Sequence, residues 1–176
     1  VTRGTPIDQI YFIERGIGSV VARTPSGDQT DPGFIGYEGM TGSAVVMDDD
    51  RSETCFMQIA GEAMCIDAVN FKAALMASPT LRLFLLRFVN YLQTQMGSTA
   101  LVNTRLKLVD RLARWLLMCD DRIIGERFSI THEFLGIMLG VRRPGVTIAL
   151  QTLEGLLLIR SRRSEVIILN RVGLIN

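Results

Sequence analysis

The sequence predicts an α+β protein with strands in its first third, helices in the middle, and a helix-turn-helix followed by a β-hairpin at its end. Three observations support this prediction. Short runs rich in β-branched and aromatic residues fill residues 1–66, which also hold nine of the 16 glycines. From Asp67 the apolar residues recur with a helical period. After residue 155 the pattern returns to two β-rich runs around a turn.

The N-terminal part is predicted to be a small barrel or sandwich of short strands. The segment QIYFIERGIGSVVART contains two β-rich runs around Gly16 and Gly18. TPSGDQ is a turn signal, and TCFMQIAGEAMCI supplies two more strands. No first strand is evident at the start, so we expect that residues are missing upstream of Val1.

Two helices are predicted next, separated by Ser78 and Pro79. Serine is a good N-cap, and proline suits the first helical position, so the second helix begins there and runs to about Val102. Six residues of this helix, most of them apolar, recur at alternating spacings of four and three, which is a heptad seam. The seam consists of Leu81, Leu85, Phe88, Leu92, Gln95 and Thr99. Two interpretations stay open: an ordinary buried helix, or a helix with one face on the barrel and the other on a second chain, which makes these residues a dimer interface.

Composition excludes several classes of protein. The cysteines, Cys55, Cys65 and Cys119, form no close pair, so we expect free thiols in a cytoplasmic protein and no cysteine-ligated metal site. No run approaches the length of a membrane span. No Ser/His/Asp set, carboxylate pair or phosphate-gripping loop is evident, and we expect no enzyme.

Charge is distributed unevenly along the chain. Residues 1–66 carry four arginines and ten acidic residues, whereas residues 67–140 carry nine basic and six acidic residues. Residues 141–176 carry six arginines and two glutamates. The basic C-terminal part is therefore the part expected to meet a polyanion.

Residues 131–155 have the spacing of a helix-turn-helix. Thr131 is a natural N-cap, Gly140 can end the first helix in the left-handed conformation, and Val141 is expected to plug the angle between the helices. Pro144 in the first turn of the second helix removes an N–H that has no helical partner. Gly145 leaves little side chain there, which allows close approach to a groove.

The segment LLLIRSRRSEVIIL predicts a hairpin beside the helix-turn-helix, and together they form a winged helix. Arginines at the hairpin turn are placed to reach DNA phosphates, and arginines at the start of a recognition helix meet base edges. His132, the only histidine, is expected to cap the helix or to touch a phosphate. The predicted DNA-binding residues are Thr131, His132, Arg142, Arg143, Gly145, Thr147, Gln151, Arg160, Arg162 and Arg163.

The chain resembles the Crp/Fnr family of bacterial transcription regulators over nearly its whole length. IDQIYFIERGIGSVV is similar to the sensor strands of that family, and PGFIGYEG to the start of its phosphate-binding cassette. THEFLGIMLGVRRPGVTIALQTLEGLLLI is close to its helix-turn-helix signature. The resemblance implies a cyclic-nucleotide-binding-like β-roll (cupin/jelly-roll-like) sensor domain, a long dimerisation helix and a C-terminal winged helix. It also implies a homodimer on a two-fold-symmetric DNA site.

The same resemblance implies roles for three residues of the second helix. Arg143 matches the arginine that reads guanine in the best-known members. Pro144 stands where they often have a base-reading glutamate, and Ile148 where they often have a second arginine. The target sequence is therefore expected to differ from theirs.

In the cassette, Gly36 fits the pattern, and Arg51-Ser52 resembles the pair that holds the cyclic phosphate. Tyr37 takes the place of the ribose-binding glutamate, and Glu38 follows one step late. These five residues are the candidate effector pocket.

The acidic run of Asp48, Asp49 and Asp50 places negative charge next to Arg51. We therefore expect that cyclic AMP is not the effector, and we expect no cofactor or metal.

The predicted domains are a β-roll over residues 1–78, a dimerisation helix over 79–103 and a winged helix over 104–176. The predicted function is a homodimeric, cytoplasmic transcription regulator that binds double-stranded DNA, with RNA polymerase as a candidate partner and no membrane contact. The alternative is a ligand-binding or protein-interaction module whose winged helix contacts protein rather than DNA.

Overall fold

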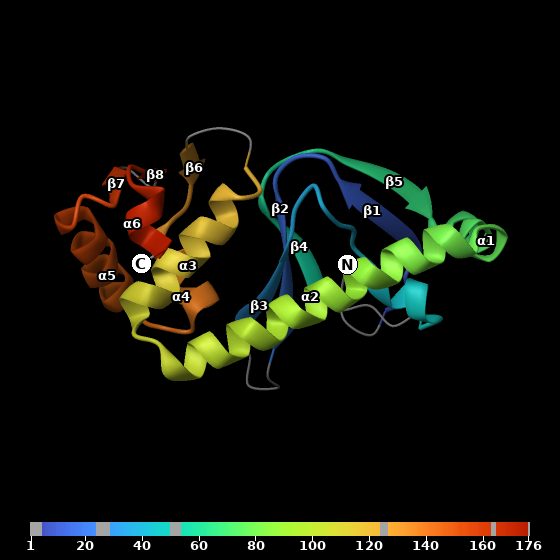
Figure 1. Ribbon diagram of the computed structural model, residues 1–176, viewed down its shortest axis with the longest axis horizontal. Coiled ribbons are helices and arrows are strands. Elements are labelled where there is room, and N and C mark those ends of the chain that lie inside the picture. Colours follow the sequence, from blue (N-terminus) through green and yellow to red (C-terminus); the bar gives the residue numbers. More distant parts are fainter. Residues whose placement is uncertain (1–4, 24–28, 50–53, 124–126, 163–164, 176) are drawn as a thin grey trace. The chain divides into compact units, whose positions relative to one another are not determined.

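The computed structural model describes residues 5–23, 29–49, 54–123, 127–162 and 165–175. Its internal contacts divide the chain into two compact units. The first unit is Val1–Ala22 with Pro32–Thr99, and the second is Arg23–Asp31 with Ala100–Asn176. Figure 1 shows strands gathered in the first unit and helices dominating the second.

The first unit is built from two antiparallel sheets and two helices. Its elements are β1 (Gln9–Ile13), β2 (Ile17–Arg23), β3 (Gln29–Ile35), the 3₁₀ helix η1 (Ser43–Met47), β4 (Thr54–Ile59), β5 (Ala63–Asp67), α1 (Ala68–Ala77) and α2 (Pro79–Arg105). Arg23 of β2, residues 29–31 of β3 and residues 100–105 of α2 are assigned to the second unit. β1 pairs with β5, and β2 lies between β3 and β4 in the second sheet. The predicted strands on both sides of Gly16 and in the segment 54–66 are confirmed.

The turn between β1 and β2 requires a glycine at position 16. Gly16 has a φ of 86°, in the left-handed region that favours glycine. A Cβ at this position would lie 2.5 Å from the carbonyl oxygen of Ile59. The chain therefore reverses here only because the residue has no side chain.

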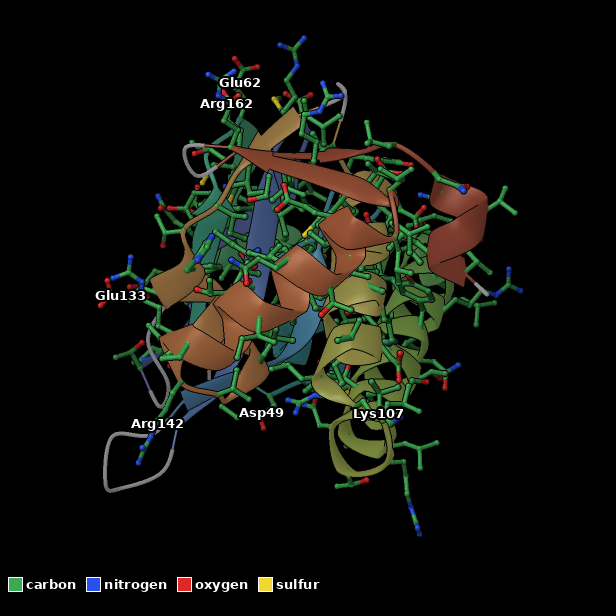
Figure 2. All side chains as sticks on the ribbon, turned by 90° about the vertical axis from the view of Figure 1, so that its left-hand side faces the viewer. Asp49, Glu62, Lys107, Glu133, Arg142 and Arg162 are labelled. Atoms are coloured by element: carbon green, nitrogen blue, oxygen red, sulfur yellow. The ribbon has the colours of Figure 1, made fainter. Side chains whose placement is uncertain are left out.

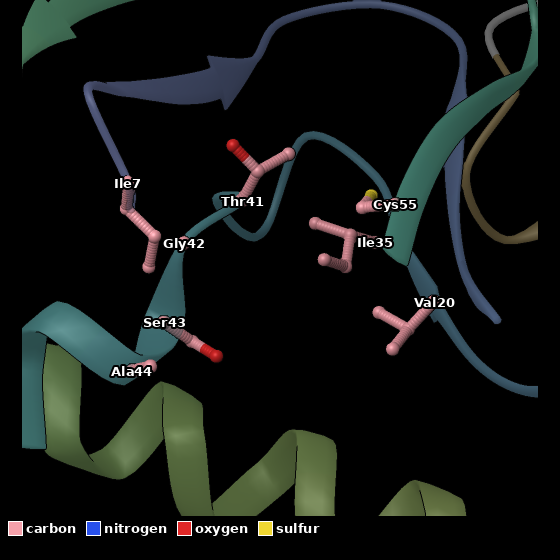
Figure 3. A pocket seen from close by; sticks show the side chains of 8 residues that line it. All are labelled: Ile7, Val20, Ile35, Thr41, Gly42, Ser43, Ala44 and Cys55. Carbon is pink, nitrogen blue, oxygen red and sulfur yellow. The ribbon is translucent and has the colours of Figure 1, made fainter. Parts of the chain in front are cut away.

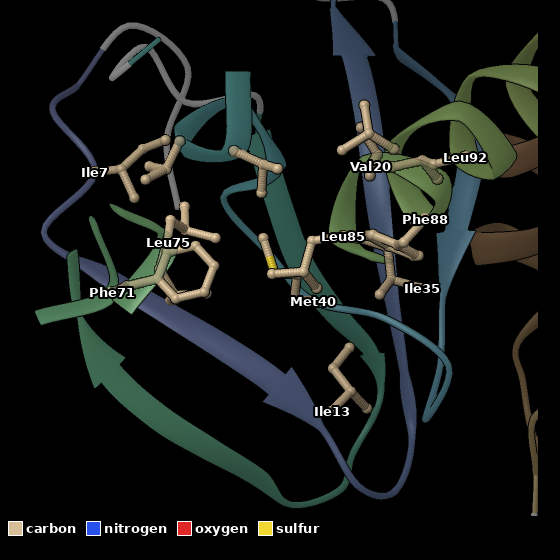
Figure 4. Close-up of a cluster of buried hydrophobic side chains, with 14 residues drawn as sticks. Ile7, Ile13, Val20, Ile35, Met40, Phe71, Leu75, Leu85, Phe88 and Leu92 are labelled. Atoms are coloured by element: carbon tan, nitrogen blue, oxygen red, sulfur yellow. The ribbon is translucent and has the colours of Figure 1, made fainter. Parts of the chain in front are cut away.

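The core of the first unit joins both sheets to the two helices (Figure 4). Its buried apolar side chains are Ile7, Ile10, Ile13, Val20, Ile35, Met40, Val45, Val46, Phe71, Leu75, Leu85, Phe88, Val89 and Leu92. Ser78 separates the helices as predicted, because its hydroxyl accepts a hydrogen bond from the Leu81 N–H at 3.3 Å. Four of the core residues come from α2, so this helix is an integral part of the N-terminal unit.

The heptad seam of α2 faces this core at its central residues, and its role as a dimer interface stays a prediction. Leu85, Phe88 and Leu92 are each less than 9% exposed and pack in the core cluster. Gln95 is buried as well, and its amide both accepts from the Phe34 N–H at 2.6 Å and donates to the Phe34 carbonyl at 3.4 Å. The central residues of the seam therefore pack against the chain's own strands.

The outward face of α2 carries a different set of apolar residues. We call it the outer face of α2, and it comprises Leu83, Phe84, Leu86, Tyr91 and Leu101. The two ends of the predicted seam, Leu81 and Thr99, are half-buried. These apolar side chains are left exposed by the core of the first unit. An exposed apolar patch of this kind is typical of a contact surface for another molecule.

The second unit is a small helical fold with one three-stranded sheet in its described residues. Its elements are α3 (Leu108–Asp120), β6 (Arg127–Ser129), α4 (His132–Leu139), α5 (Arg143–Gly155), β7 (Ile159–Arg162), β8 (Glu165–Ile168) and α6 (Arg171–Ile175). β8 lies between β6 and β7, with all pairs antiparallel. Trp115 of α3 is buried. No helix in the described part of the chain is long and apolar enough to cross a membrane.

Helix α6 was not predicted. Its Arg171 forms ion pairs with Asp120 and Asp121, where α3 ends. Hydrogen bonds from Arg171 to the carboxylates of Asp121 and Asp120 raise the pKa of this guanidinium. The contacts join the last helix of the unit to α3.

Candidate nucleic-acid interface

The turn between α4 and α5 is closed by backbone hydrogen bonds. The Thr131 hydroxyl accepts from the Phe134 N–H at 3.1 Å and caps α4, as predicted. At the other end Gly140 has a φ of 64°, and the N–H of Val141 donates to the Gly136 carbonyl at 2.8 Å. This is the pattern of a Schellman motif, which ends a helix at a left-handed residue. The turn therefore has the sharp reversal that a helix-turn-helix needs.

The inner stripes of the two helices fix the position of α5. The buried residues of α4 and α5 are Leu135, Gly136, Met138, Leu139, Val146, Ala149, Leu150 and Leu153. α5 packs on both α3 and α4. The predicted apolar spacing is confirmed, and Val141, expected between the helices, is half-buried.

The start of α5 leaves its arginines in solvent. Arg142 is the N-cap residue but makes no side-chain capping hydrogen bond. Arg143 and Pro144 follow in the first turn, and the Gly145 N–H donates to the Arg142 carbonyl at 2.9 Å. Both arginine side chains are exposed, and Figure 2 shows Arg142 extending away from the ribbon. Positive charge at a helix N-terminus opposes the helix dipole, so this arrangement suits contact with an anion.

The exposed side of α5 continues beyond the arginines. Gln151 is exposed, as predicted. Ile148 is 64% exposed, at the position where the resemblance to the Crp/Fnr family places a second arginine.

Gly145 has a different environment from the one predicted. A Cβ on this residue would lie 3.2 Å from a methyl group of Leu108, at the start of α3. Packing against α3 is thus the reason that the structure gives for a small residue here. A DNA contact by Gly145 stays a prediction.

His132 and Thr147 contact each other. His132 Nδ1 lies 3.0 Å from Thr147 Oγ1, which joins the start of α4 to the middle of α5. Both residues were predicted to touch DNA, and neither was predicted to touch the other.

The hairpin of β7 and β8 is the predicted wing, and it is anchored to α5. The Glu154 carboxylate accepts a hydrogen bond from the Ser161 N–H at 2.6 Å. Arg160 and Arg162 of β7 are exposed, and Figure 2 shows Arg162 extending away from the ribbon. Arg163 lies outside the described residues. The second unit therefore presents exposed arginines on both the helix and the wing.

The family model of the Crp-like helix-turn-helix domain matches residues 110–176. This part of the chain is similar to Crp-like helix-turn-helix domains. Its matched residues include all elements from α3 onward except the first two residues of that helix. No curated protein shows significant sequence similarity to the chain.

Solved structures show the same fold over the whole chain. A CRP-family transcriptional regulator from Thermus thermophilus aligns with a TM-score of 0.76 and 18% identity, over 98% of this chain and 88% of that chain. A second regulator from the same organism, of the CRP/FNR family, aligns at 0.77 and 18%, over 99% and 90%. The c-di-GMP-responsive global regulator of Xanthomonas campestris aligns at 0.74 and 16%, over 96% and 87%. The predicted resemblance to the Crp/Fnr family and the predicted fold class are confirmed.

Arg111 makes hydrogen bonds within the second unit. Arg111 of α3 donates from Nη2 to the Leu139 carbonyl, at the end of α4, and from Nε to Asn103 Oδ1 at 3.1 Å. Burial lowers the pKa of this guanidinium. Arg111 thus positions the turn before the recognition helix instead of adding to the exposed charge.

The first unit contains a small pocket between its strands and η1 (Figure 3). It has an empty volume of about 300 Å³, part of it open to solvent. Its lining residues are Ile7, Val20, Ile35, Thr41, Gly42, Ser43, Ala44 and Cys55. The described lining is therefore apolar, with two hydroxyl groups and a thiol.

The predicted effector residues that the structure describes, Gly36, Tyr37 and Glu38, are not among the lining residues of this pocket. Gly36 is buried in a turn closed by the Gly39 N–H, which donates to its carbonyl at 3.0 Å. Tyr37 and Glu38 occupy the corners of that turn and are exposed. Arg51 and Ser52 lie outside the described residues.

Asp48, the first residue of the acidic run, has a partner that the sequence did not predict. This aspartate forms an ion pair with Arg82 of α2 at 2.6 Å, and its side chain is 75% exposed. Asp49 is exposed as well, and Asp50 lies outside the described residues. The charge of Asp48 is therefore partly neutralised by a surface pair, which weakens the electrostatic argument against a bound cyclic phosphate.

Proposed function

We propose that the protein is a sequence-specific DNA-binding transcription regulator that acts as a homodimer on a two-fold-symmetric site. The observation that supports this best is the uncapped, exposed Arg142–Arg143 pair at the start of α5. A serine, threonine, aspartate or asparagine at the N-cap of α5 would stabilise the domain by about 1 kcal/mol. The chain has Arg142 at this position instead, at the N-terminus of the helix that enters the major groove in such domains.

The residues of α5 divide into two roles in this proposal. Arg143 donates to O6 and N7 of a guanine, which is the commonest specific contact of arginine. Ile148, exposed on the same helix, makes an apolar contact with a thymine methyl group where a second arginine would read a guanine. Gln151 adds a polar contact further along the helix.

The wing and the N-cap residue supply contacts that do not depend on sequence. Arg142, Arg160 and Arg162 are exposed, and in the proposal each neutralises a phosphate. Such contacts give affinity and register, and they make binding dependent on salt. Arg163 has the same role by its place in the sequence.

The homodimer forms through the outer face of α2. Phe84 is 66% exposed and Leu101 62% exposed, and burying such a side chain contributes about 1.5–3 kcal/mol. Two copies related by a two-fold axis present the same face to each other. The two recognition helices then reach half-sites about one helical turn of DNA apart.

Gel shift of pooled genomic DNA fragments at two salt concentrations tests this function. We expect a minority of fragments to be retained at the higher salt, with a shared inverted repeat among them. Retention of all fragments equally at low salt and of none at high salt would mean that the domain binds DNA without reading sequence. No retention at either salt concentration would contradict the proposed function.

A further inference from the structure

Exposed basic side chains of the second unit continue beyond α5 to the segment that joins α2 to α3. Arg105 is the last residue of α2, and Lys107 directly precedes α3. Both side chains are exposed, as are those of Arg142 and Arg143 at the start of α5. We call these four residues the basic patch. Within the described ranges, none of the four side chains forms an ion pair or a hydrogen bond with another described residue.

The two halves of the basic patch are neighbours because α3 packs on α5. A Cβ on Gly145, in the first turn of α5, would lie 3.2 Å from Leu108 Cδ2. Leu108 directly follows Lys107, so the contact brings the start of α3 beside the start of α5. The two labelled members of the patch, Lys107 and Arg142, both lie in the lower part of Figure 2.

The acidic side chains of α3 leave the basic patch with a net positive charge. Asp120 and Asp121 lie at the far end of this helix, where they pair with Arg171. The helix has 13 residues and is therefore about 20 Å long, roughly twice the screening length at physiological salt. Asp110 is the acidic residue in the first turn of α3, and its single carboxylate is set against four cations.

A strand of DNA is the anion that fits this arrangement. In the proposed complex the first residues of α5 enter the major groove, which a row of phosphates borders on each side. Along one strand a phosphate follows about every 3.4 Å of the helix axis, and packed helices lie about 8–10 Å apart. An element that packs beside the start of α5 therefore lies about two or three phosphates away from the bases that α5 reads.

We propose that Arg105 and Lys107 bind phosphates beside the groove that α5 enters, so that the DNA-binding surface includes the junction of α2 and α3. The inference rests on the proposed function. It adds two contacts that lie before residues 110–176, the part that matches the Crp-like domain. Because phosphate contacts carry no sequence information, both residues affect the affinity for all sequences alike.

A salt series measures the number of phosphate contacts. Affinity of the full chain for a duplex recovered by the gel shift is measured by fluorescence anisotropy. We expect Lys107→Gln and Arg105→Gln each to reduce the slope of log affinity against log salt by about one per bound chain. Each variant then loses about threefold less affinity per chain than the wild type between about 50 and 200 mM salt. Lys107→Arg keeps the charge and should keep the slope.

Arg15→Gln is the control for net charge. It removes an exposed positive charge from the first unit, and it should leave the salt slope unchanged. An equal reduction of the slope by Arg15→Gln would show that total charge is measured, not a contact of the basic patch, and would overturn the inference.

Lys107→Ser separates DNA binding from folding. Lys107 is the N-cap residue of α3 but makes no side-chain capping hydrogen bond, whereas serine is a good N-cap. We expect a higher Tm in differential scanning calorimetry together with weaker DNA binding. DNA binding that is unchanged in this variant would overturn the role of Lys107.

Ethylation of single phosphates locates the contacts on the DNA. We expect Lys107→Gln to tolerate ethylation at one phosphate of each half-site where ethylation blocks the wild type, with the other sensitive positions unchanged. An unchanged ethylation pattern and an unchanged salt slope in both glutamine variants would overturn the inference alone. Absence of DNA binding by the wild type would contradict the proposed function and the inference with it.

Discussion

The guanidinium of Arg111 donates a hydrogen bond to the carbonyl oxygen of Leu139, the last residue of α4. The Schellman motif at this helix end uses the carbonyls of Gly136 and Ile137, which leaves those of the last residues without helical partners. Arg111 supplies a partner for one of them, and its positive charge lies at the negative end of the helix dipole. The Arg111 side chain thus holds the end of α4, next to the turn that leads into α5.

Arg111→Met tests this relationship. Methionine keeps a long apolar stem but cannot donate to Leu139 or to Asn103. Hydrogen bonds from charged groups contribute about 1.5–3 kcal/mol, so we expect a decrease of that size in the free energy of unfolding of the second unit. Urea denaturation followed by Trp115 fluorescence measures it. Arg105→Met, which changes an exposed arginine at the end of α2, is the control and should change stability by less than about 0.5 kcal/mol. Equal stability of the two variants would show that the Arg111 contact is dispensable.

Gly136→Ala is expected to damage the helix-turn-helix although alanine favours helices. A Cβ at Gly136 would lie 2.8 Å from the carbonyl oxygen of Val141, so the turn has to open. Such overpacking costs about 1–3 kcal/mol. Gly155→Ala is the matched control, because a Cβ there meets nothing within 4 Å. Differential scanning calorimetry should show a lower Tm for Gly136→Ala and an unchanged or higher Tm for Gly155→Ala. The reverse order would refute the assigned turn geometry.

The two faces of α2 are expected to respond differently to substitution. Phe84→Asp places charge on the outer face and should turn a dimer into a monomer while circular dichroism stays unchanged. Leu92→Ala empties a core position and should cost about 2–5 kcal/mol of stability. Light scattering at micromolar concentration measures the first effect, and denaturant unfolding the second. A wild-type chain that is monomeric under these conditions would rule out the dimer.

Cyclic AMP is expected not to bind to the first unit at micromolar concentration. A cyclic phosphate needs a cation or several N–H donors in its pocket, and the described lining of the pocket is apolar with two hydroxyls. Tyr37 and Glu38 lie in an exposed turn, away from the lining. Titration calorimetry with cyclic AMP and cyclic GMP measures this. Low-micromolar binding that Arg51→Ala abolishes would prove the expectation wrong.

The sequence predicted most of the fold because its strongest signals are local. The spacing from Leu135 to Leu153, the N-cap Thr131 and the left-handed Gly140 each act within a few residues, and the structure confirms all three. The strands around Gly16 were predictable for the same reason.

The contacts that the sequence did not predict join segments far apart in the sequence. A heptad spacing shows that Leu85 and Leu92 share one face of a helix, but it does not show whether strands or a second chain cover that face. In this chain a strand covers the face near Gln95, because the backbone N–H of Phe34 donates a hydrogen bond to the Gln95 side chain, 61 residues away in the sequence. His132 and Thr147 meet for a comparable reason, since their contact depends on the angle at which α4 and α5 cross.

The central claim is that α5 reads DNA sequence through Arg143, and its most direct test is the binding of Arg143→Ala to the selected duplex and to duplexes altered at single base pairs. We expect a loss of about 1–3 kcal/mol on the selected duplex and no remaining preference at one guanine position. Arg162→Ala is the control, and it should weaken binding to all duplexes alike and reduce the salt slope by about one. If Arg143→Ala kept both the affinity and the sequence preference of the wild type, α5 would not be the recognition helix.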